Sequence, residues 1–243
     1  ITVGYIIMRV AILGQWLRAG IEHPQNREAA FKYAGGIFVV QLLWVGRLLL
    51  PPALYTPSFL VFIVIEMSIP VWAEWRNRTT WHPGHIAERY ALFAIILLGE
   101  VVAAASGAMQ VALAESGLTP VLVTIGLSGL VLLFASWWLY FLEPAEAGLR
   151  QRRSWSYFWG YGHYLLFAGI AAIGGGLELA VDVAGHHPRI GLVAVGYALA
   201  VPVALVLAML YVLPRPFRQP DEVPGRVLIP AAVPTLLAPL AAP

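Results

Sequence analysis

The sequence predicts an all-α protein, a polytopic bundle of transmembrane helices with about eight spans. Two observations carry this prediction. Of the 243 residues, 60% are hydrophobic and only 12% are charged, whereas a soluble domain is about one quarter charged. The apolar residues also gather in runs of about 20, which suit a membrane-crossing helix and are far longer than the roughly ten residues of a barrel strand. We therefore expect one transmembrane domain over residues 1–243.

Composition also excludes several classes of function. A net charge of +2 is too small for a surface that binds nucleic acid. The chain has no Cys, so disulfides and thiolate metal sites are excluded. The sequence lacks the His-Glu-x-x-His and Gly-x-Ser-x-Gly motifs. We predict no cofactor, no bound metal and no catalytic residue, and we lean against an enzyme.

The expected spans follow one another with short connections. They cover residues 1–18, 31–50, 57–75, 84–109, 119–142, 156–181 and 190–213, and an eighth begins at 227. Pro70 and Pro202 fall inside spans, where proline in a membrane bundle more often kinks a helix than ends it.

Basic residues alternate between the loops, and this alternation predicts the orientation. Loops one, three, five and seven are basic, loops two and four hold no Arg or Lys, and loop six holds Arg189 alone. Because positively charged loops stay in the cytoplasm, we expect the odd loops inside and residue 1 outside. The basic residues counted in the odd loops are Arg18, Arg27, Lys32, Arg76, Arg78, Arg150, Arg152, Arg153, Arg215, Arg218 and Arg226.

A short pattern occurs twice. Trp81, Gly84, His85 and Glu100 have the same spacing as Trp159, Gly162, His163 and Glu178, 78 residues later. The period holds one inward and one outward helix, so 57–109 and 119–181 would form a parallel internal repeat. The alternative is that membrane helices share Trp at interfaces and Gly at contacts.

Three carboxylates lie inside the expected spans: Glu66, Glu100 and Glu178. An ionisable side chain in lipid costs on the order of 3 kcal/mol or more, so it normally faces a partner, a cavity or water. We expect these three, with Arg9 and His163, to line a pathway for protons, cations or a small solute. Within this chain Arg9 is the expected cationic partner of Glu100. The alternative is that each acid is neutral and forms a structural hydrogen bond.

A second polar cluster lies at the cytoplasmic end of span 84–109 and contains His82, His85, Glu88 and Arg89. The spacing of the two His residues and Glu88 could hold a divalent metal. Pro83 next to His82 equally marks the start of a helix, and we favour that interpretation. The pair His186-His187 is expected to be a solvated outer loop.

Gly162, Gly169 and Gly176 recur every seven residues along span 156–181. Small residues at this spacing form a smooth stripe on one helix face. The stripe predicts a close contact with a neighbouring helix.

The run from Trp81 to Glu100, together with Trp137-Trp-Leu-Tyr-Phe141 and Gly176-Leu-Glu178, resembles the bacterial low temperature requirement protein A family. The resemblance covers about residues 5–182 and implies a multi-pass protein of the bacterial inner membrane. The family name records a growth requirement in the cold and no chemical activity. The family's N-terminal Trp-Glu-x-Phe-Phe-Asp-Leu motif is absent, so we expect an internal fragment.

The function we expect is transporter-like or channel-like handling of protons, cations or a small solute through buried carboxylates. The first alternative is an intramembrane enzyme acting on a lipid or a small apolar substrate, with the cluster at His82 as its polar site. The second is a structural or sensory membrane protein. The expected partners are the lipid bilayer and a small solute or ion, and a homo-oligomer stays open.

Overall fold

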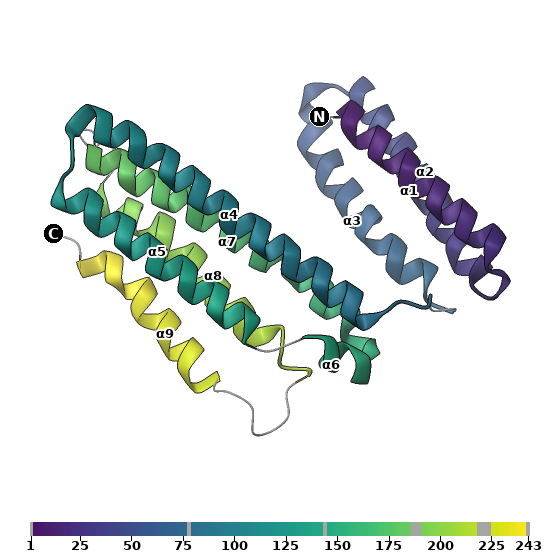
Figure 1. The fold of residues 1–243 in the computed structure, drawn as a ribbon. Coiled ribbons are helices and arrows are strands. Elements are labelled where there is room, and N and C mark those ends of the chain that lie inside the picture. The colour runs from purple at the N-terminus through teal and green to yellow at the C-terminus, as the bar shows by residue number, and fades with distance from the viewer. Residues whose placement is uncertain (1, 77–78, 143–144, 186–190, 218–224, 242–243) are drawn as a thin grey trace. The chain divides into compact units, whose positions relative to one another are not determined.

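The computed structural model describes residues 2–76, 79–142, 145–185, 191–217 and 225–241, and every regular element in these ranges is a helix. This confirms the all-α class. The chain divides into two compact units, residues 1–81 and 82–243 (Figure 1). The expectation of one domain over the whole chain stays a prediction.

Unit 1 is an antiparallel arrangement of α1 (Thr2–Glu22), α2 (Arg27–Gly46) and α3 (Tyr55–Ala73). The middle helix, α2, packs against both others. Gly36 on α2 allows this approach, because a Cβ placed there would lie 2.8 Å from Cγ2 of Ile69 on α3. The buried core of the unit contains Tyr33, Val40, Ile69 and Ala73.

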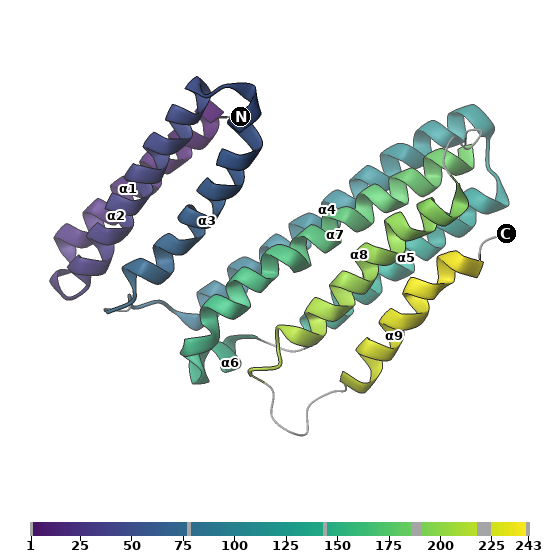
Figure 2. The ribbon, with the colours of Figure 1, turned by 180° about the vertical axis from the view of Figure 1, so that it is seen from behind.

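Unit 2 is a larger helical bundle (Figure 2). Helices α4 and α7 lie side by side and run in the same direction, and α5 and α8 run the opposite way (Figure 1 and Figure 2). This agrees with the expected equal orientation of the two spans that carry the repeated pattern. The elements are α4 (Pro83–Ser116), α5 (Pro120–Phe141), α6 (Ala145–Gln151), α7 (Ser156–Gly185), α8 (Leu192–Val212) and α9 (Gly225–Leu237).

The glycine stripe of α7 faces α8, as the heptad spacing predicts. A Cβ at Gly162 would lie 2.2 Å from Leu213, and one at Gly169 would lie 2.8 Å from Val206. At Gly176 the nearest atom would be the carbonyl oxygen of Ala198, at 2.7 Å. Such distances are too short for a methyl group, so the close packing of α7 on α8 depends on these glycines.

Six of the described helices are long and apolar enough to cross a membrane: α2, α3, α4, α5, α7 and α8. The expected number of eight is therefore a slight overcount. Helix α1 forms as expected, but it is not apolar enough to count as a membrane span, because Arg9, Arg18 and Glu22 lower its mean hydropathy. Helix α9 has 13 residues, about 20 Å at 1.5 Å per residue, against about 30 Å of hydrocarbon.

Large apolar side chains lie on the outside of these helices. Val131 is 69% exposed, Phe134 68% and Ile96 63%. In water, contiguous exposure of this kind is rare and marks a surface that contacts lipid or protein. Together with the six apolar spans, it identifies a membrane protein.

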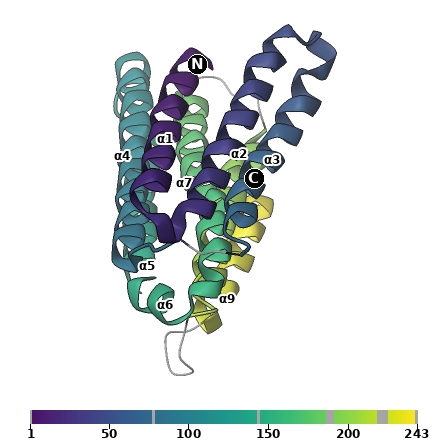
Figure 3. The same ribbon diagram turned by 90° about the vertical axis from the view of Figure 1, so that its right-hand side faces the viewer.

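The basic loops of unit 2 meet at one end of the bundle. Arg152 donates to the carbonyl oxygen of Pro216. Helix α6 packs against the start of α4, at the lower end of the bundle in Figure 3. Loops five and seven thus lie together with the start of α4, and their assignment to the cytoplasmic face stays a prediction. Five residues named from the sequence lie outside the described residues: Arg78, His186, His187, Arg189 and Arg218.

Candidate solute-binding site

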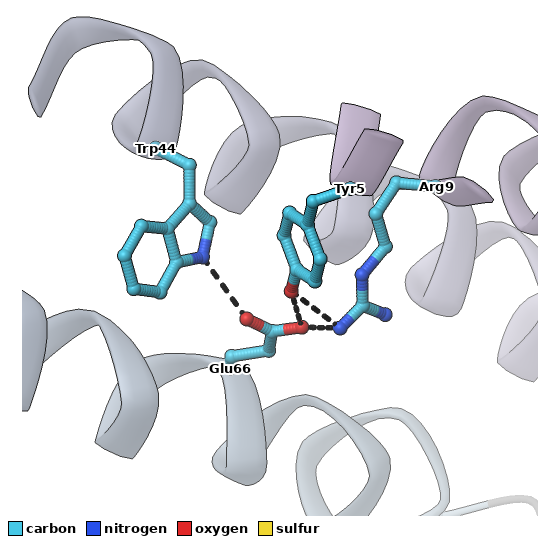
Figure 4. A network of polar contacts seen from close by, with 4 residues as sticks. All are labelled: Tyr5, Arg9, Trp44 and Glu66. Atoms are coloured by element: carbon cyan, nitrogen blue, oxygen red, sulfur yellow. Dashed lines mark hydrogen bonds and ion pairs between the residues drawn. The ribbon is translucent and has the colours of Figure 1, made fainter. Parts of the chain in front are cut away.

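Glu66 lies inside α3 and faces side chains from both other helices of unit 1 (Figure 4). Tyr5 and Arg9 are four residues apart on α1, so they project from the same face of that helix. Trp44 comes from the last turn of α2. Each of the three helices of unit 1 therefore contributes to one polar network.

The carboxylate of Glu66 is compensated on both oxygens. Arg9 forms an ion pair with Oε1, and the Tyr5 hydroxyl donates to the same oxygen at 2.5 Å. The Trp44 indole donates from Nε1 to Oε2 at 3.0 Å. Arg9 also donates to the Tyr5 hydroxyl at 2.6 Å, so the guanidinium and the phenol hold each other in place.

The network borders a cavity of about 170 Å³. A water molecule needs only about 10–15 Å³ on this measure, so the cavity has room for a small solute. Tyr5, Arg9, Gln41 and Glu66 form its polar part. The remaining lining residues are Ile12, Trp16, Tyr33, Ile37, Val40, Ile69 and Pro70.

Trp16 and Tyr33 form an aromatic wall of the cavity. Their rings stack with centroids 4.0 Å apart and planes within 7°. The Tyr33 hydroxyl donates to Glu74 at 3.2 Å, which fixes the ring from its far end. This wall is rigid because packing on one side and a hydrogen bond on the other restrain it.

Gln41 supplies an amide that nothing in the described chain satisfies. Its Nε2 is buried and lacks a hydrogen-bond partner, and it alone among the buried side-chain nitrogens and oxygens of the described residues does so. A buried polar group without a partner costs about 1–3 kcal/mol. Because Gln41 lines the cavity, a molecule bound there could satisfy it.

The Arg9–Glu66 ion pair is a preformed and partly buried feature of this site. Side chains of Arg9 and Glu66 are 23% and 18% exposed, so the pair is largely shielded. A proton on Glu66 would leave the Arg9 charge without its partner in a shielded site, which is costly. The arrangement therefore favours the charged, paired state of both side chains.

The other two expected acids lie in unit 2 and are exposed. Glu100 and Glu178 have no hydrogen bond or ion pair with any described residue. Helix α4 continues to Ser116, seven residues beyond the expected end, so Glu100 sits near mid-helix, about 26 Å from Pro83. Arg9 forms its ion pair with Glu66, a pairing that the sequence did not indicate.

His163 is buried, with 2% of its surface exposed. Its Nδ1 lies 2.7 Å from the Trp159 carbonyl oxygen, and its Nε2 lies 3.3 Å from the Tyr140 hydroxyl. A neutral imidazole with its proton on Nδ1 satisfies both contacts. Rings of Tyr90 and Phe167 pack against it, so His163 joins α4, α5 and α7. It is not among the residues that line the cavity of unit 1.

The cluster at the start of α4 is a helix start. His82 precedes the helix, and its Nδ1 accepts from the His85 backbone N–H at 3.4 Å. Nδ1 of His85 lies 3.7 Å from Oε2 of Glu88, and Arg89 is exposed. Within the described ranges no three His, Asp or Glu side chains are grouped as metal ligands would be.

The sequence named Glu66 and Arg9 as site residues, but it did not name Tyr5, Gln41 or Trp44 as such. Tyr5 shares a helix face with Arg9, and that spacing was available in the sequence. Gln41 is the one polar side chain among the residues 36–46, and that isolation in an apolar span could have identified it. Trp44 gave no signal, because a tryptophan near a span end equally fits an interfacial aromatic belt.

Comparison with known proteins places the chain in a family. A model of the bacterial low temperature requirement A protein family matches residues 1–243. Uncharacterized protein RA0937 of Rhizobium meliloti (strain 1021) is 27% identical over 174 residues, which are 65% of this chain and 42% of that protein. The chain thus spans less than half the length of this relative. No solved structure matches the chain. The chain belongs to the bacterial low temperature requirement A family.

Proposed function

We propose that this membrane protein binds a small solute in the cavity of unit 1 and conducts it across the bacterial inner membrane in a transporter-like manner. The observation that carries the proposal is the cavity of about 170 Å³ bordered by the Arg9–Glu66 ion pair and the unpartnered amide of Gln41. Charged groups inside a membrane domain mark solute and ion pathways. The basic loops of the odd connections would then face the cytoplasm.

The ion pair could couple the binding of a solute to a movement of the helices. Arg9 and Glu66 come from different helices, α1 and α3, so their contact joins two elements directly. A solute that hydrogen bonds to either partner changes the balance of contacts between these helices. A ligand shifts the helices from one arrangement to another only when it binds the two arrangements with different affinity.

Exposed Glu100 and Glu178 extend the proposal to unit 2. Each is an acid on an apolar, membrane-length helix, and an acid there needs water or a partner. We propose that these two acids contribute to passage of the solute separately from its binding in the cavity of unit 1. Glu100→Gln and Glu178→Gln should then lower the rate of passage and leave binding in unit 1 unchanged.

The proposal is tested by flux in proteoliposomes that contain the purified chain. Labelled urea, acetate and methylammonium represent neutral, anionic and cationic solutes, and a trapped pH dye reports protons. We expect at least one of these to pass faster than through protein-free liposomes. Glu66→Gln should reduce that flux about tenfold, a loss of about 1.4 kcal/mol.

The matched control is Glu22→Gln. Glu22 lies on the same unit, is 49% exposed and pairs with Arg18 at 2.8 Å on its own helix. This substitution removes the same charge without touching the cavity, and flux should persist. Rates no higher than in protein-free liposomes, or equal flux in wild type and Glu66→Gln, would count against the proposal.

A further inference from the structure

We infer that the solute bound in unit 1 is a small uncharged molecule with an apolar body and a carbonyl or amide group. This inference rests on the proposed function, because it names the chemical class that the cavity would take. It draws on three features of the cavity: its charge balance, its walls and the amide of Gln41.

The charge balance selects against ions. Arg9 and Glu66 are the two charged side chains that line the cavity, and they already neutralise each other. An anion would have to displace Glu66 from Arg9, and a cation would have to displace Arg9 from Glu66. Either exchange leaves a charge without a partner in a shielded site, which is unfavourable.

The walls select an apolar body. Ile12, Ile37, Val40 and Ile69 line the cavity with aliphatic surface, and the stacked Trp16–Tyr33 pair adds a flat aromatic face. Val40 is 4% and Ile69 is 7% exposed, so these walls belong to the packed core of the unit. A planar or compact apolar molecule gains burial against them.

Gln41 selects the polar group. Its buried Nε2 donor has no partner, although all other buried side-chain nitrogens and oxygens of the described chain do. A carbonyl oxygen on the solute would accept from it. A primary amide would also offer an N–H to the Gln41 carbonyl, so it matches the side chain at both atoms.

Equilibrium dialysis against the protein in nanodiscs tests this inference, with empty nanodiscs to subtract partition into lipid. The three probes share one ring and differ in charge: benzamide, benzoate and benzylammonium. We expect benzamide to bind at least about tenfold more tightly than either ion. Equal or tighter binding of an ion, or no binding of benzamide, would overturn the inferred class.

Gln41→Met tests the assigned residue, since Met has nearly the length of Gln but no amide. It should weaken benzamide binding about tenfold. It should also raise the unfolding midpoint of the ligand-free protein by about 2–4 °C, because an unpartnered buried amide is removed. The matched control, Gln110→Met, alters an exposed amide on α4 and should change neither value.

These outcomes separate the inference from the proposed function. Benzamide binding that Gln41→Met leaves unchanged would remove Gln41 from the site. Glu66-dependent flux of acetate or methylammonium, with no benzamide binding, would retain the proposed function and overturn the neutral class. Benzamide binding that depends on Gln41, without flux of any solute, would retain the inferred class and overturn transport.

Discussion

At the scale of single residues, side chains from both neighbouring helices hold Glu66 in place. Its two oxygens accept from Arg9, Tyr5 and Trp44, so the carboxylate carries three interactions from two neighbouring helices. Removing one partner of a shielded ion pair leaves the other uncompensated, which costs more than the pair contributes. The interaction between Arg9 and Glu66 can therefore be measured by comparing the unfolding free energies of the two single variants with that of the double variant.

Arg9→Gln and Glu66→Gln should each lower the free energy of unfolding by about 2 kcal/mol, less than for a fully buried pair because both side chains are partly exposed. The double substitution should cost clearly less than the sum, with a coupling of about 1–2 kcal/mol. Unfolding in mixed detergent micelles gives these values. For the exposed pair Arg18–Glu22, the corresponding single and double substitutions should give a coupling free energy of about 0.3–0.5 kcal/mol. Additive costs at Arg9 and Glu66 would show that they do not interact.

Trp44→Phe keeps the aromatic ring and removes the N–H that reaches Glu66. The ring packs edge-on against Phe59 and Phe62, so the core should stay filled, and the loss should be about 1 kcal/mol. The matched change Trp138→Phe affects a side chain that is 62% exposed and should be nearly neutral. Equal stabilities of these two variants would remove Trp44 from the network.

The sequence indicated the charged members of this site and not their pairing. A charge inside an apolar span is visible in any hydropathy reading, which is how Glu66 and Arg9 were found. Which acid meets which base depends on how α1 and α3 each pack on α2, and no local sequence pattern records that. Gln41 was missed because the lack of a hydrogen-bond partner for its buried Nε2 shows only in the folded chain.

At the scale of elements, the close approach of α7 to α8 depends on glycines at fixed positions. Gly176→Ala would place a methyl group 2.7 Å from the Ala198 carbonyl oxygen, whereas a Cβ at Gly175 meets nothing within 4 Å. Both changes favour the helical backbone by up to about 1 kcal/mol. Gly175→Ala should therefore be neutral or stabilising, and Gly176→Ala should cost about 1–3 kcal/mol through overpacking. Thermal unfolding measures both, and equal midpoints would mean that α7 and α8 do not pack at Gly176.

Helix positions were predicted well because apolar runs of membrane length are distinctive. The ends were predicted less well. Helix α4 was expected to end near residue 109, but it continues through Ala112 to Ser116, where Gly117 takes a positive φ of 71° and ends it. Small and weakly polar residues in this stretch lower hydropathy without lowering helix propensity, so a hydropathy limit ends too early.

At the scale of the whole molecule, the basic loops predict how the chain lies in the membrane. The chain has no Cys, so single Cys substitutions report each loop without background. Ala53→Cys and Leu118→Cys lie in loops two and four, and both positions are exposed. They should react with an impermeant thiol reagent added to whole cells, and Gln25→Cys and Ser154→Cys in loops one and five should not. The reverse pattern would invert the orientation.

The two-copy pattern at His85 and His163 also belongs to this scale. Its first copy lies at the start of α4, where His85 is exposed, and its second lies within α7, where His163 is buried. The helix pairs 57–109 and 119–181 should still superpose by a rotation about the membrane normal if the repeat is real. A structure of the whole protein in lipid would test this, and separations beyond about 5.4 Å between the matched residues would contradict it.

The central claim is that the cavity of unit 1 admits solutes, and one thiol measurement tests it directly. Val40 and Val181 are both buried, 4% and 1% exposed, but Val40 lines the cavity whereas Val181 lies in the packed cluster with Ala112 and Leu122. In the cysteine-free chain, Val40→Cys should react with N-ethylmaleimide at least about tenfold faster than Val181→Cys, since a reagent reaches a packed core only through local unfolding. Equal slow rates at both positions would show that the cavity is closed to solutes and would contradict the account.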